Sequence, residues 1–596
     1  MGVFMSKFNK IEADVLVIGG GGAGFRSAIE AASAGLDTLL LNKGRLARSG
    51  ATIMADSDLT VDGQSLREFG FFGEPRDSKD KFFNDIVTQG FYLNNQKMVE
   101  NYVNEAPDRI RELLDWGIYV ESSEERALET PGQSIMDALY NQARKVGVKM
   151  LEDILVTDLL TSGSIVIGAL GLDLMSGELI IFSAKAVILS TGGWHKAFDP
   201  NAGSRELSGD GIAMAFRAGA TLGNMEFVTF CANCVLWPRH LRGSLFTYIM
   251  HIITRGPIYN RDGQNLFEKY DPYVVEKASG SEWNKCVISN MTYREVLDGK
   301  GSEHGGVYYS ISKENWPEVD RAIGSYFPGW KYRGGNFSEL RTTLANGGRI
   351  EVAPAAEYFE GGIYVDVDYK SSLEGLYAAG ESAMSLFGAN RVVAATTEML
   401  VTGAIAGRSA AGFAKNIKLV EPSEEQIEIL SQRISNMMKI QGKYLPSSIL
   451  ADIREKSYEL LGPIRNEKGL EKFLVFLNEI KDKISNEMYL ESDRMKYNLD
   501  LIEAIEINNI VQLLEVAASA ALKRTESRGV HYRSDFPITD NEDWMRQTLI
   551  TKGREGVEIN YEPVKMTKMQ PDSKKHLYME MVKELMKSRS DITGGH

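Results

Sequence analysis

The spacing of apolar residues predicts alternating strands and helices near the start of the chain. Consecutive apolar residues at 15–18 and 38–41 are typical of two buried strands. Residues 25–34, which lie between them, have the apolar spacing of a helix. A strand, a helix and a second strand in this order predict a βαβ unit with parallel strands.

The same patterns continue along the chain and divide it. Helical spacing covers residues 101–116, 134–146, 397–413 and most of 422–524. Apolar runs predict strands at 154–160, 165–173, 179–183, 186–190 and 373–381. The strand at 186–190 ends at a glycine pair, which suggests that the chain returns there to the first sheet. Residues 229–350 have weaker periodicity and more aromatic and basic side chains, so we expect an inserted domain.

Glycines join the first predicted strand to the helix. Gly19, Gly21 and Gly24 form a G-x-G-x-x-G motif at this junction. One glycine allows the tight turn, one allows the backbone to approach a pyrophosphate, and one allows the helix to pack closely on the strand. The pyrophosphate would lie on the free N–H groups at the positive end of the helix. In this context the motif predicts a dinucleotide-binding site.

Composition excludes several classes of protein. The 596 residues suffice for several domains, and 43% apolar with 25% charged residues is typical of a globular protein. A net charge of −14 argues against nucleic-acid binding, which uses a basic face. The chain has no run of about 18 apolar residues, and its first 14 residues lack the apolar core of a secretory signal. We therefore expect a cytoplasmic protein with no direct membrane span.

The three cysteines, Cys231, Cys234 and Cys286, indicate a reducing compartment. An iron–sulfur cluster needs about four thiolate ligands, so these residues cannot hold one alone. Any cluster that exchanges electrons with this chain would therefore belong to another subunit. Cys231 and Cys234 have the C-x-x-C spacing of a redox pair, and two buried apolar thiols are the alternative interpretation. The histidines lack the spacing of metal ligands, so we expect no metal site.

Further motifs follow the glycine turn in a fixed order. They lie at residues 186–193, 208–212 (Ser-Gly-Asp-Gly-Ile), 375–381 (Gly-Leu-Tyr-Ala-Ala-Gly-Glu), 388–391 (Gly-Ala-Asn-Arg) and 526–537 (beginning Glu-Ser-Arg-Gly-Val-His-Tyr-Arg). Together they resemble the flavoprotein subunits of the succinate dehydrogenase and fumarate reductase family. That family also includes L-aspartate oxidase and the adenylylsulfate reductase flavoprotein. The resemblance covers nearly the whole chain.

The resemblance implies an α/β fold of several parts. We expect an FAD-binding Rossmann domain of the glutathione-reductase type, an inserted α+β capping domain and a C-terminal helical domain. The FAD-binding domain would comprise 12–228 and 351–418, and the cap 229–350. The helical domain would comprise 419–535, with a tail at 536–596. Closure of the cap would exclude water from the cleft between the domains.

The cofactor that the resemblance implies is FAD. Its pyrophosphate would lie over residues 21–24, and Asn42 would contact the adenosine ribose where the family often has an acid. Glu381 and Asp210 would contact FAD hydroxyl groups or nearby FAD atoms. The other cofactor contacts that the resemblance implies are Gly19, Gly22, Ala23, Lys43, Ser49, Gly50, Ala51, Thr191, Gly192, Arg391, Thr396 and Thr397.

One departure from the family concerns the linkage to the flavin. Respiratory members bond the flavin covalently to a histidine in a Ser-His-Thr stretch. The corresponding residues here are Ser49, Gly50 and Ala51, and glycine has no side chain to form the bond. The sequence therefore predicts a non-covalent FAD with a lower potential than that of the covalent members.

The substrate residues of the family are only partly present. Members clamp a dicarboxylate with two arginines and two histidines, while one further arginine and a glutamate move the proton. The histidine positions are Cys231 and Glu357 here, and the glutamate position is Ile252. The proton-donating arginine is missing, with Lys285 as a candidate substitute. Arg255 and Arg391 are retained.

A carboxylate at the position of Glu357 changes the expected substrate. Two like charges 4 Å apart repel by about 1–4 kcal/mol at effective dielectric constants of 80 to 20. Unless Glu357 is protonated, fumarate, succinate and aspartate are therefore all disfavoured. We expect Arg255, Arg391, Glu357 and Cys231 to form the catalytic site for a small organic substrate with one anionic group. Glu357 would act as a hydrogen-bond acceptor or a base, and Arg391 would contact the flavin, the substrate or both.

Three functions remain open at this point. The first is a flavoprotein subunit that transfers a hydride between FAD and a small anionic substrate. It would exchange electrons with an iron–sulfur subunit, which could hold it at the periphery of a membrane. The second is a stand-alone oxidase of the L-aspartate oxidase type, and the third is an electron-transfer subunit whose substrate site has decayed.

Overall fold

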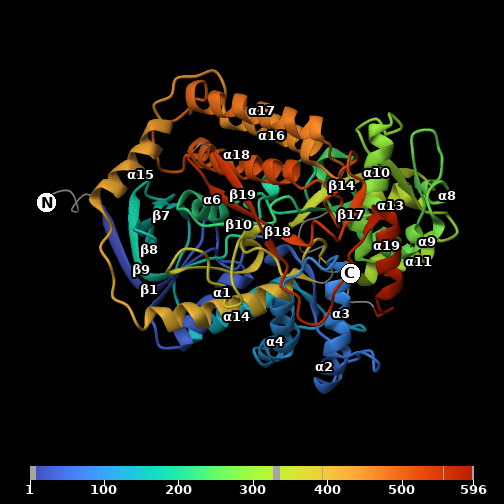
Figure 1. Ribbon diagram of the computed structural model, residues 1–596, viewed down its shortest axis with the longest axis horizontal. Helices are drawn as coiled ribbons and strands as arrows, with labels where there is room; N and C mark the ends of the chain where they lie inside the picture. Colours follow the sequence, from blue (N-terminus) through green and yellow to red (C-terminus); the bar gives the residue numbers. More distant parts are fainter. Residues whose placement is uncertain (1–7, 255, 327–335, 392–393, 555, 593–596) are drawn as a thin grey trace.

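The computed structural model describes residues 8–254, 256–326, 336–391, 394–554 and 556–592 (Figure 1). Its main sheet has seven strands in the order β6-β2-β1-β9-β8-β7, with β16 paired to β9. The strands are β1 (Asn9–Ile18), β2 (Thr38–Leu41), β6 (Lys149–Leu151), β7 (Ile154–Ser162), β8 (Ile165–Asp173), β9 (Leu179–Leu189) and β16 (Leu376–Ala378). Strands β6, β2, β1, β9 and β16 pair in parallel, whereas β8 and β7 pair antiparallel.

The parallel pairing of β1 with β2 and with β9 confirms the predicted βαβ unit and the predicted return to the first sheet. The two strands expected at 179–183 and 186–190 are a single strand, β9, and this prediction of a break was wrong. Lys185 lies within this continuous strand. Its ammonium group lies 2.7 Å from a carboxylate oxygen of Asp14, so the lysine stays in the strand without burying its charge.

Helix α1 (Gly22–Ser33) packs closely against α14 (Ala395–Ala414) on one face of this sheet (Figure 1). Gly403 and Gly407, one turn apart in α14, permit the close approach. A Cβ at residue 403 would lie 2.7 Å from the Ala23 carbonyl oxygen, and one at residue 407 would lie 2.5 Å from that of Ser27. This packing brings the first turns of both helices to the same edge of the sheet. Nearby elements are α2 (Gly63–Glu68), α3 (Lys79–Gln89), α4 (Gln96–Asp115), α5 (Gly132–Lys145), α6 (Asp210–Arg217), β3 (Asp56–Thr60), β4 (Ser122–Ser123) and β5 (Ala127–Pro131).

The inserted segment has a sheet of its own, in the order β11-β14-β13-β12. Its strands are β11 (Val228–Val235), β12 (Ile258–Tyr259), β13 (Val307–Ser310) and β14 (Arg349–Phe359). Its helices are α7 (Phe246–Thr254), α8 (Leu266–Lys269), α9 (Pro272–Ser279), α10 (Ile288–Leu297), α11 (Trp316–Tyr326) and α13 (Ser338–Ala345). Residues of this sheet and of the surrounding helices form an apolar cluster separate from the main core. The expected boundaries at 229 and 350 fall inside β11 and β14, which pair with each other.

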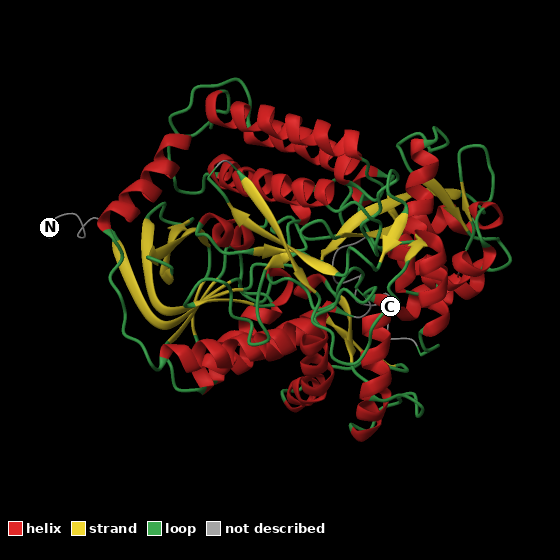
Figure 2. Ribbon diagram, in the orientation of Figure 1, coloured by secondary structure: helices red, strands yellow, loops and turns green. Residues whose placement is uncertain are grey.

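Helices α15 (Glu424–Met437), α16 (Pro446–Leu461), α17 (Glu467–Asn486) and α18 (Leu499–Lys523) follow, and Figure 2 shows the last three side by side. The segment expected as a tail contains β17 (Ile538–Asp540), β18 (Arg546–Lys552), β19 (Val557–Pro563), β20 (Lys575–Leu577) and α19 (Tyr578–Ser588). Strand β18 pairs with β10 (Leu222–Gly223), which pairs with β15 (Gly362–Ile363). Helix α19 contributes Tyr578 and Leu585 to the apolar cluster of the inserted segment. No helix in the described ranges is long and apolar enough to cross a membrane.

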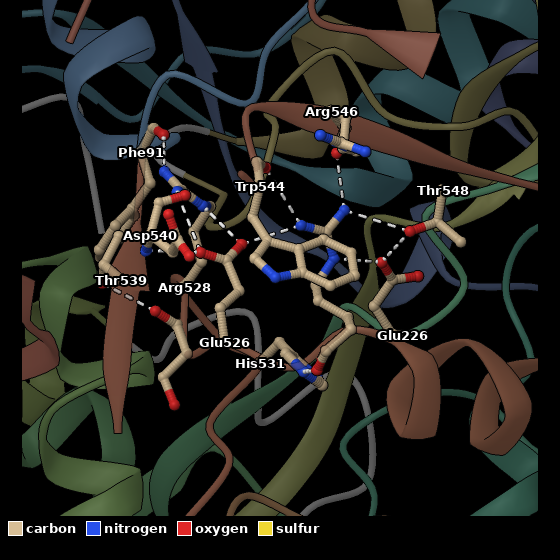
Figure 3. A network of polar contacts seen from close by, with 12 residues as sticks. Phe91, Glu226, Glu526, Arg528, His531, Thr539, Asp540, Trp544, Arg546 and Thr548 are labelled. Atoms are coloured by element: carbon tan, nitrogen blue, oxygen red, sulfur yellow. Dashed lines mark hydrogen bonds and ion pairs between the residues drawn. The ribbon is translucent and has the colours of Figure 1, made fainter. Parts of the chain in front are cut away.

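A buried network of ion pairs joins these parts (Figure 3). Arg524, at the end of α18, donates to Glu226 at 2.7 Å and to Glu526 at 2.8 Å. Arg528 donates to Glu526 at 2.9 Å and to the carbonyl oxygen of Phe91 at 3.0 Å. All four charged side chains are fully buried. Glu526 and Arg528 of the Glu-Ser-Arg-Gly motif therefore connect the end of α18 with the segments around Phe91 and Glu226.

Candidate active site

A cavity of about 580 Å³ connects the glycine turn after β1 with strands β11 and β14 of the inserted segment. This volume is within the usual range for cofactor and ligand sites. Most of the residues expected around a cofactor and a substrate line it, although they come from distant parts of the chain. These residues are Gly19, Gly21, Gly22, Ala23, Asn42, Lys43, Ser49, Gly50, Ala51, Thr191, Gly192, Asp210, Cys231, Glu357, Glu381, Arg391 and Thr396. Gly24, Thr397 and the candidate proton donor Lys285 lie outside the lining, and Arg255 lies outside the described residues.

The glycines of the turn have different physical roles. A Cβ at residue 24 would lie 1.8 Å from the carbonyl oxygen of Gly19, so only glycine allows α1 to approach β1 this closely. Gly19 itself has a φ of +109° and faces the Ser190 carbonyl oxygen. A Cβ at residue 21 would meet only the Thr52 hydroxyl, at 3.7 Å. Gly21 therefore leaves the backbone open at the start of α1, where a phosphate group could approach the helix end.

Asn42 and Lys43 organise the wall of the cavity. The Asn42 side chain accepts a hydrogen bond from the Gly20 backbone at 2.9 Å and donates one to the Ser49 hydroxyl at 2.9 Å. The Lys43 ammonium lies 2.8 Å from Asp210 and 2.6 Å from Glu506. Burial opposes both charges, but the lysine lowers the pKa of Asp210 and the two carboxylates raise the pKa of Lys43. Lys43 and Asp210 are thus paired with each other at the edge of the cofactor region.

Glu381 presents an unused acceptor to the cavity. One of its carboxylate oxygens accepts a hydrogen bond from the Gly193 backbone at 2.9 Å. The other is buried, lies 3.6 Å from His195 Nε2 and has no hydrogen-bond partner among the described residues. Burial raises the pKa of this carboxyl group, partly offset by His195. A buried acceptor without a partner is costly, so it fits a ligand hydroxyl group there. Together with the open glycine turn, Glu381 makes this end of the cavity a suitable site for FAD.

Charged side chains gather at the other end, where β14 meets the loop that follows β16. Arg391 forms an ion pair with Glu357, and Lys285 approaches the same carboxylate at 3.5 Å. Lys285 also pairs with Glu282. Burial alone would raise the pKa of Glu357, but Arg391 and Lys285 lower it to about 2. Glu357 is therefore ionised at neutral pH and is a poor base.

The cysteines of β11 are apolar thiols in this structure. Cys231 and Cys234 are both buried, and neither forms a disulfide. Burial raises the pKa of each thiol above its usual range, and the negative charge of Glu357 raises it further. The Cys234 sulfur donates to the Cys231 carbonyl oxygen at 3.6 Å. These observations favour the interpretation as buried thiols over a redox pair, which requires a reactive thiolate. Cys231 contributes a neutral surface to the cavity.

The capping segment adds an apolar wall to the charged end. Leu245, which precedes α7, and Tyr248 and Ile249 in its first turn line the cavity, together with Phe337. The sequence indicated aromatic and apolar residues in this segment without showing that they face the substrate region. A substrate in contact with this wall would bury part of an apolar body there.

Two further residues in the lining escaped the sequence analysis. They are Tyr358, on β14, and Glu398, in the first turn of α14. The Tyr358 hydroxyl donates a hydrogen bond to the Glu398 carboxylate, and the Ser385 hydroxyl donates another at 3.0 Å. The signal that could have identified Glu398 is a lone acid among apolar positions at the start of a predicted helix.

Comparisons with known proteins agree with this geometry. Residues 14–396 match the FAD binding domain model, and residues 452–576 match the model described as fumarate reductase flavoprotein C-term. A fumarate reductase (CoM/CoB) chain of Methanothermobacter marburgensis is 30% identical, covering 91% of this chain and 98% of that protein. The succinate dehydrogenase flavoprotein subunit of Rickettsia conorii is 28% identical, covering 93% and 95% respectively.

Solved structures show the same fold. Mycobacterium smegmatis Sdh1 in complex with UQ1 has a TM-score of 0.82 and 28% identity, covering 95% of this chain and 96% of that chain. Adenylylsulfate reductase from Archaeoglobus fulgidus has a TM-score of 0.76 and 19% identity, covering 94% and 97%, a likeness of fold alone. The cofactor of the FAD binding domain is FAD, for which the glycine turn and Glu381 provide a suitable site. The chain therefore belongs to the FAD-binding family of fumarate reductase and succinate dehydrogenase flavoproteins, and it is an FAD-dependent oxidoreductase.

Proposed function

We propose that the protein is the flavoprotein subunit of a reductase or dehydrogenase that acts on a small organic substrate with one carboxylate. Bound FAD would supply or accept the hydride. The continuity of the cavity carries this proposal. Gly21 and Glu381 at the cofactor end and Arg391 and Glu357 at the charged end belong to one lining. A substrate at the charged end would thus be held within reach of the cofactor.

The charges at this end support a monocarboxylate. Arg391 and Lys285 contribute two positive charges, and the carboxylates of Glu357 and Glu282 offset them. Glu357 already occupies the position between two cations that a substrate carboxylate would take. Arg255, which the family resemblance places at the site, would add one further cation. That leaves one positive charge for the substrate, and the apolar wall around Tyr248 favours a substrate with an apolar body.

The exchange of electrons with an iron–sulfur subunit is the second part of the proposal. The three cysteines are buried and not grouped as cluster ligands, and no metal-binding group of His, Cys, Asp and Glu occurs within the described ranges. The relative from Rickettsia conorii bears the name of a flavoprotein subunit, which supports assembly with other chains. Such a partner could also hold the protein beside a membrane. Copurification of a cysteine-rich iron–sulfur protein with the untagged complex would test this part.

The FAD is expected to be non-covalent. Gly50 lines the cavity, has a φ of +83° and offers no atom for a bond to the isoalloxazine ring. Acid precipitation of the holoenzyme should therefore release all of the flavin into the supernatant, measured by its fluorescence. Flavin fluorescence that stays with the denatured polypeptide on a gel would show that another residue forms a covalent bond.

Reoxidation of the reduced flavin tests the substrate class. The holoenzyme would be reduced anaerobically with one equivalent of dithionite and mixed with unsaturated monocarboxylates, such as crotonate and cinnamate, or with fumarate. We expect the monocarboxylates to restore the oxidised flavin spectrum faster than fumarate does, because the charged end accepts one carboxylate. Faster reoxidation by fumarate would contradict the proposal. Peroxide release in air alone would favour the oxidase, and no response to any acid would favour the decayed site.

A further inference from the structure

Glu398 and Tyr358 are a hydrogen-bonded pair in the wall of the cavity, and no step described so far uses them. Glu398 is 2% exposed and Tyr358 is 3% exposed, yet both contribute to the lining. The Tyr358 hydroxyl donates to one oxygen of the Glu398 carboxylate, and Ser385 donates to the other. The guanidinium of Arg391 lies over the Tyr358 ring, 4.9 Å from its centre. Tyr358 thus lies between Glu398 and the charged end of the cavity.

Glu398 can change its charge near neutral pH. Burial raises the pKa of this carboxyl group to about 7, although the hydroxyl groups of Tyr358 and Ser385 and the charge of Arg391 act in the opposite direction. Burial and the Glu398 charge raise the pKa of Tyr358 well above its usual value. The titratable and charged groups that face Glu398 from neighbouring elements are Tyr102, Tyr358, Tyr369, Glu381 and Arg391.

We propose that Glu398 and Tyr358 form the proton-transfer pair of this active site, with Glu398 storing the proton and Tyr358 passing it to the substrate. This inference rests on the proposed function, because it assigns the proton that must accompany hydride transfer. Family members use an arginine and a glutamate for that purpose, and neither is present at the corresponding positions here. Glu357 cannot replace them, since a carboxyl group with a pKa of about 2 holds no proton at neutral pH.

The transfer balances without an added reactant. In the reducing direction, the hydride adds to one carbon of a double bond and the Tyr358 hydroxyl proton adds to the other. As the Tyr358 O–H bond breaks, the Glu398 proton moves to the phenol oxygen, so that tyrosine is neutral before and after the step. Glu398 is left as a carboxylate, which the hydroxyl groups of Tyr358 and Ser385 stabilise. Solvent returns its proton, and every movement reverses when the substrate is oxidised.

The coupling of the two groups has a physical reason. Tyrosine alone would be left as a buried tyrosinate next to a carboxylate, which its raised pKa shows to be unfavourable. Tyr358 contacts both Glu398, through its hydroxyl group, and Arg391, through its ring. A general acid works best when its pKa lies near the operating pH, and Glu398 satisfies that condition.

The experiment measures the proton directly in the holoenzyme. Infrared difference spectra of the oxidised protein, recorded from pH 5 to 9, report the C=O stretch of protonated carboxyl groups. The wild type, Glu398→Gln and Tyr358→Phe would be compared with Glu360→Gln. Glu360 is a suitable control because burial raises its pKa to about 8, but it does not line the cavity and it accepts a hydrogen bond from Thr229.

We expect a protonated carboxyl signal with a pKa of about 7 in the wild type and in Glu360→Gln. Glu398→Gln should lose this signal and keep only that of Glu360, with a pKa of about 8. In Tyr358→Phe the pKa should move upward, because the carboxylate loses a hydrogen-bond donor. A signal near pH 7 that persists in Glu398→Gln would overturn the inference, and so would its absence from the wild type. The infrared measurement needs no substrate. It therefore tests this inference even if no substrate of the proposed class is found.

Turnover supplies the second readout, with whichever acid reoxidises the wild-type flavin. The kcat of Glu398→Gln in the reducing direction should fall by about 100-fold or more and lose its dependence on a group near pH 7. KM should change little, because the substrate carboxylate would bind near Arg391, which contacts Tyr358 and not Glu398 directly. An unchanged pH profile in Glu398→Gln would refute the catalytic role, even if the infrared signal were assigned correctly.

Discussion

Replacing Glu357 by glutamine is expected to increase the affinity of the cavity for dicarboxylates by roughly tenfold or more. The ionised side chain pairs with Arg391 and Lys285, and its substitution leaves both cations without their shared partner. A substrate carboxylate could then take the place of the Glu357 carboxylate. The repulsion between these two carboxylates, about 1–4 kcal/mol at 4 Å, would disappear. Titration of the oxidised flavin spectrum with fumarate and succinate would give the dissociation constants.

A matched substitution on the same strand separates this effect from a general loss of charge. Glu351, also on β14, bonds to His304 at 2.8 Å and does not line the cavity. Glu351→Gln should leave dicarboxylate affinity within about twofold of the wild type, as expected for a charge outside the site. Equal or weaker binding of fumarate to Glu357→Gln would mean that Arg391 and Lys285 do not form a carboxylate site.

Substitution of Glu526 by alanine is expected to destabilise the protein by about 3–5 kcal/mol, the usual cost of breaking a buried ion pair. The side chain accepts hydrogen bonds from Arg524 and Arg528 and from the Asp540 backbone at 2.9 Å (Figure 3). Its removal leaves two fully buried guanidinium groups with unpaired donors. Urea-induced unfolding followed by tryptophan fluorescence suits the measurement, because Arg524 lies 5.0 Å from the centre of the Trp544 ring.

An exposed ion pair provides the comparison. Glu459 pairs with Lys456 on the surface of α16, one helical turn away. Glu459→Ala should change stability by no more than about 1 kcal/mol, because exposed pairs contribute little. Similar unfolding midpoints for Glu526→Ala and Glu459→Ala would show that the buried network contributes no more to stability than a surface pair.

The local features of the cofactor region were predictable from the sequence. The βαβ unit follows from two apolar runs and a helical spacing, and the need for glycine at positions 19 and 24 follows from the turn between them. Such patterns depend on residues close together in the chain, whose geometry the backbone largely fixes. The ordered motifs then identified the family and its cofactor. The absence of a side chain at Gly50, from which a non-covalent FAD was predicted, is also evident from the sequence alone.

The tertiary structure decided what depends on distant neighbours. The sequence predicted separate strands at 179–183 and 186–190, but pairing with β1 along both ranges makes them one strand, β9. The segment after 536 showed no clear periodicity, yet it contains β18, which pairs with the distant strand β10.

The charge states of the active site were hidden for the same reason. Glu357 is ionised because Arg391 and Lys285 surround it, whereas Glu398 has a raised pKa because it is buried without a directly paired cation among the described residues. Both are glutamates at the edge of one cavity, and the sequence gives no sign of this difference. It arises from burial and from charges that only the fold brings together, since electrostatic interactions depend on distance in space and on exclusion of water. The sequence by itself determined the family, the cofactor and the glycine turn, whereas the burial of Glu398 and the cations around Glu357 decided which acid can hold a proton.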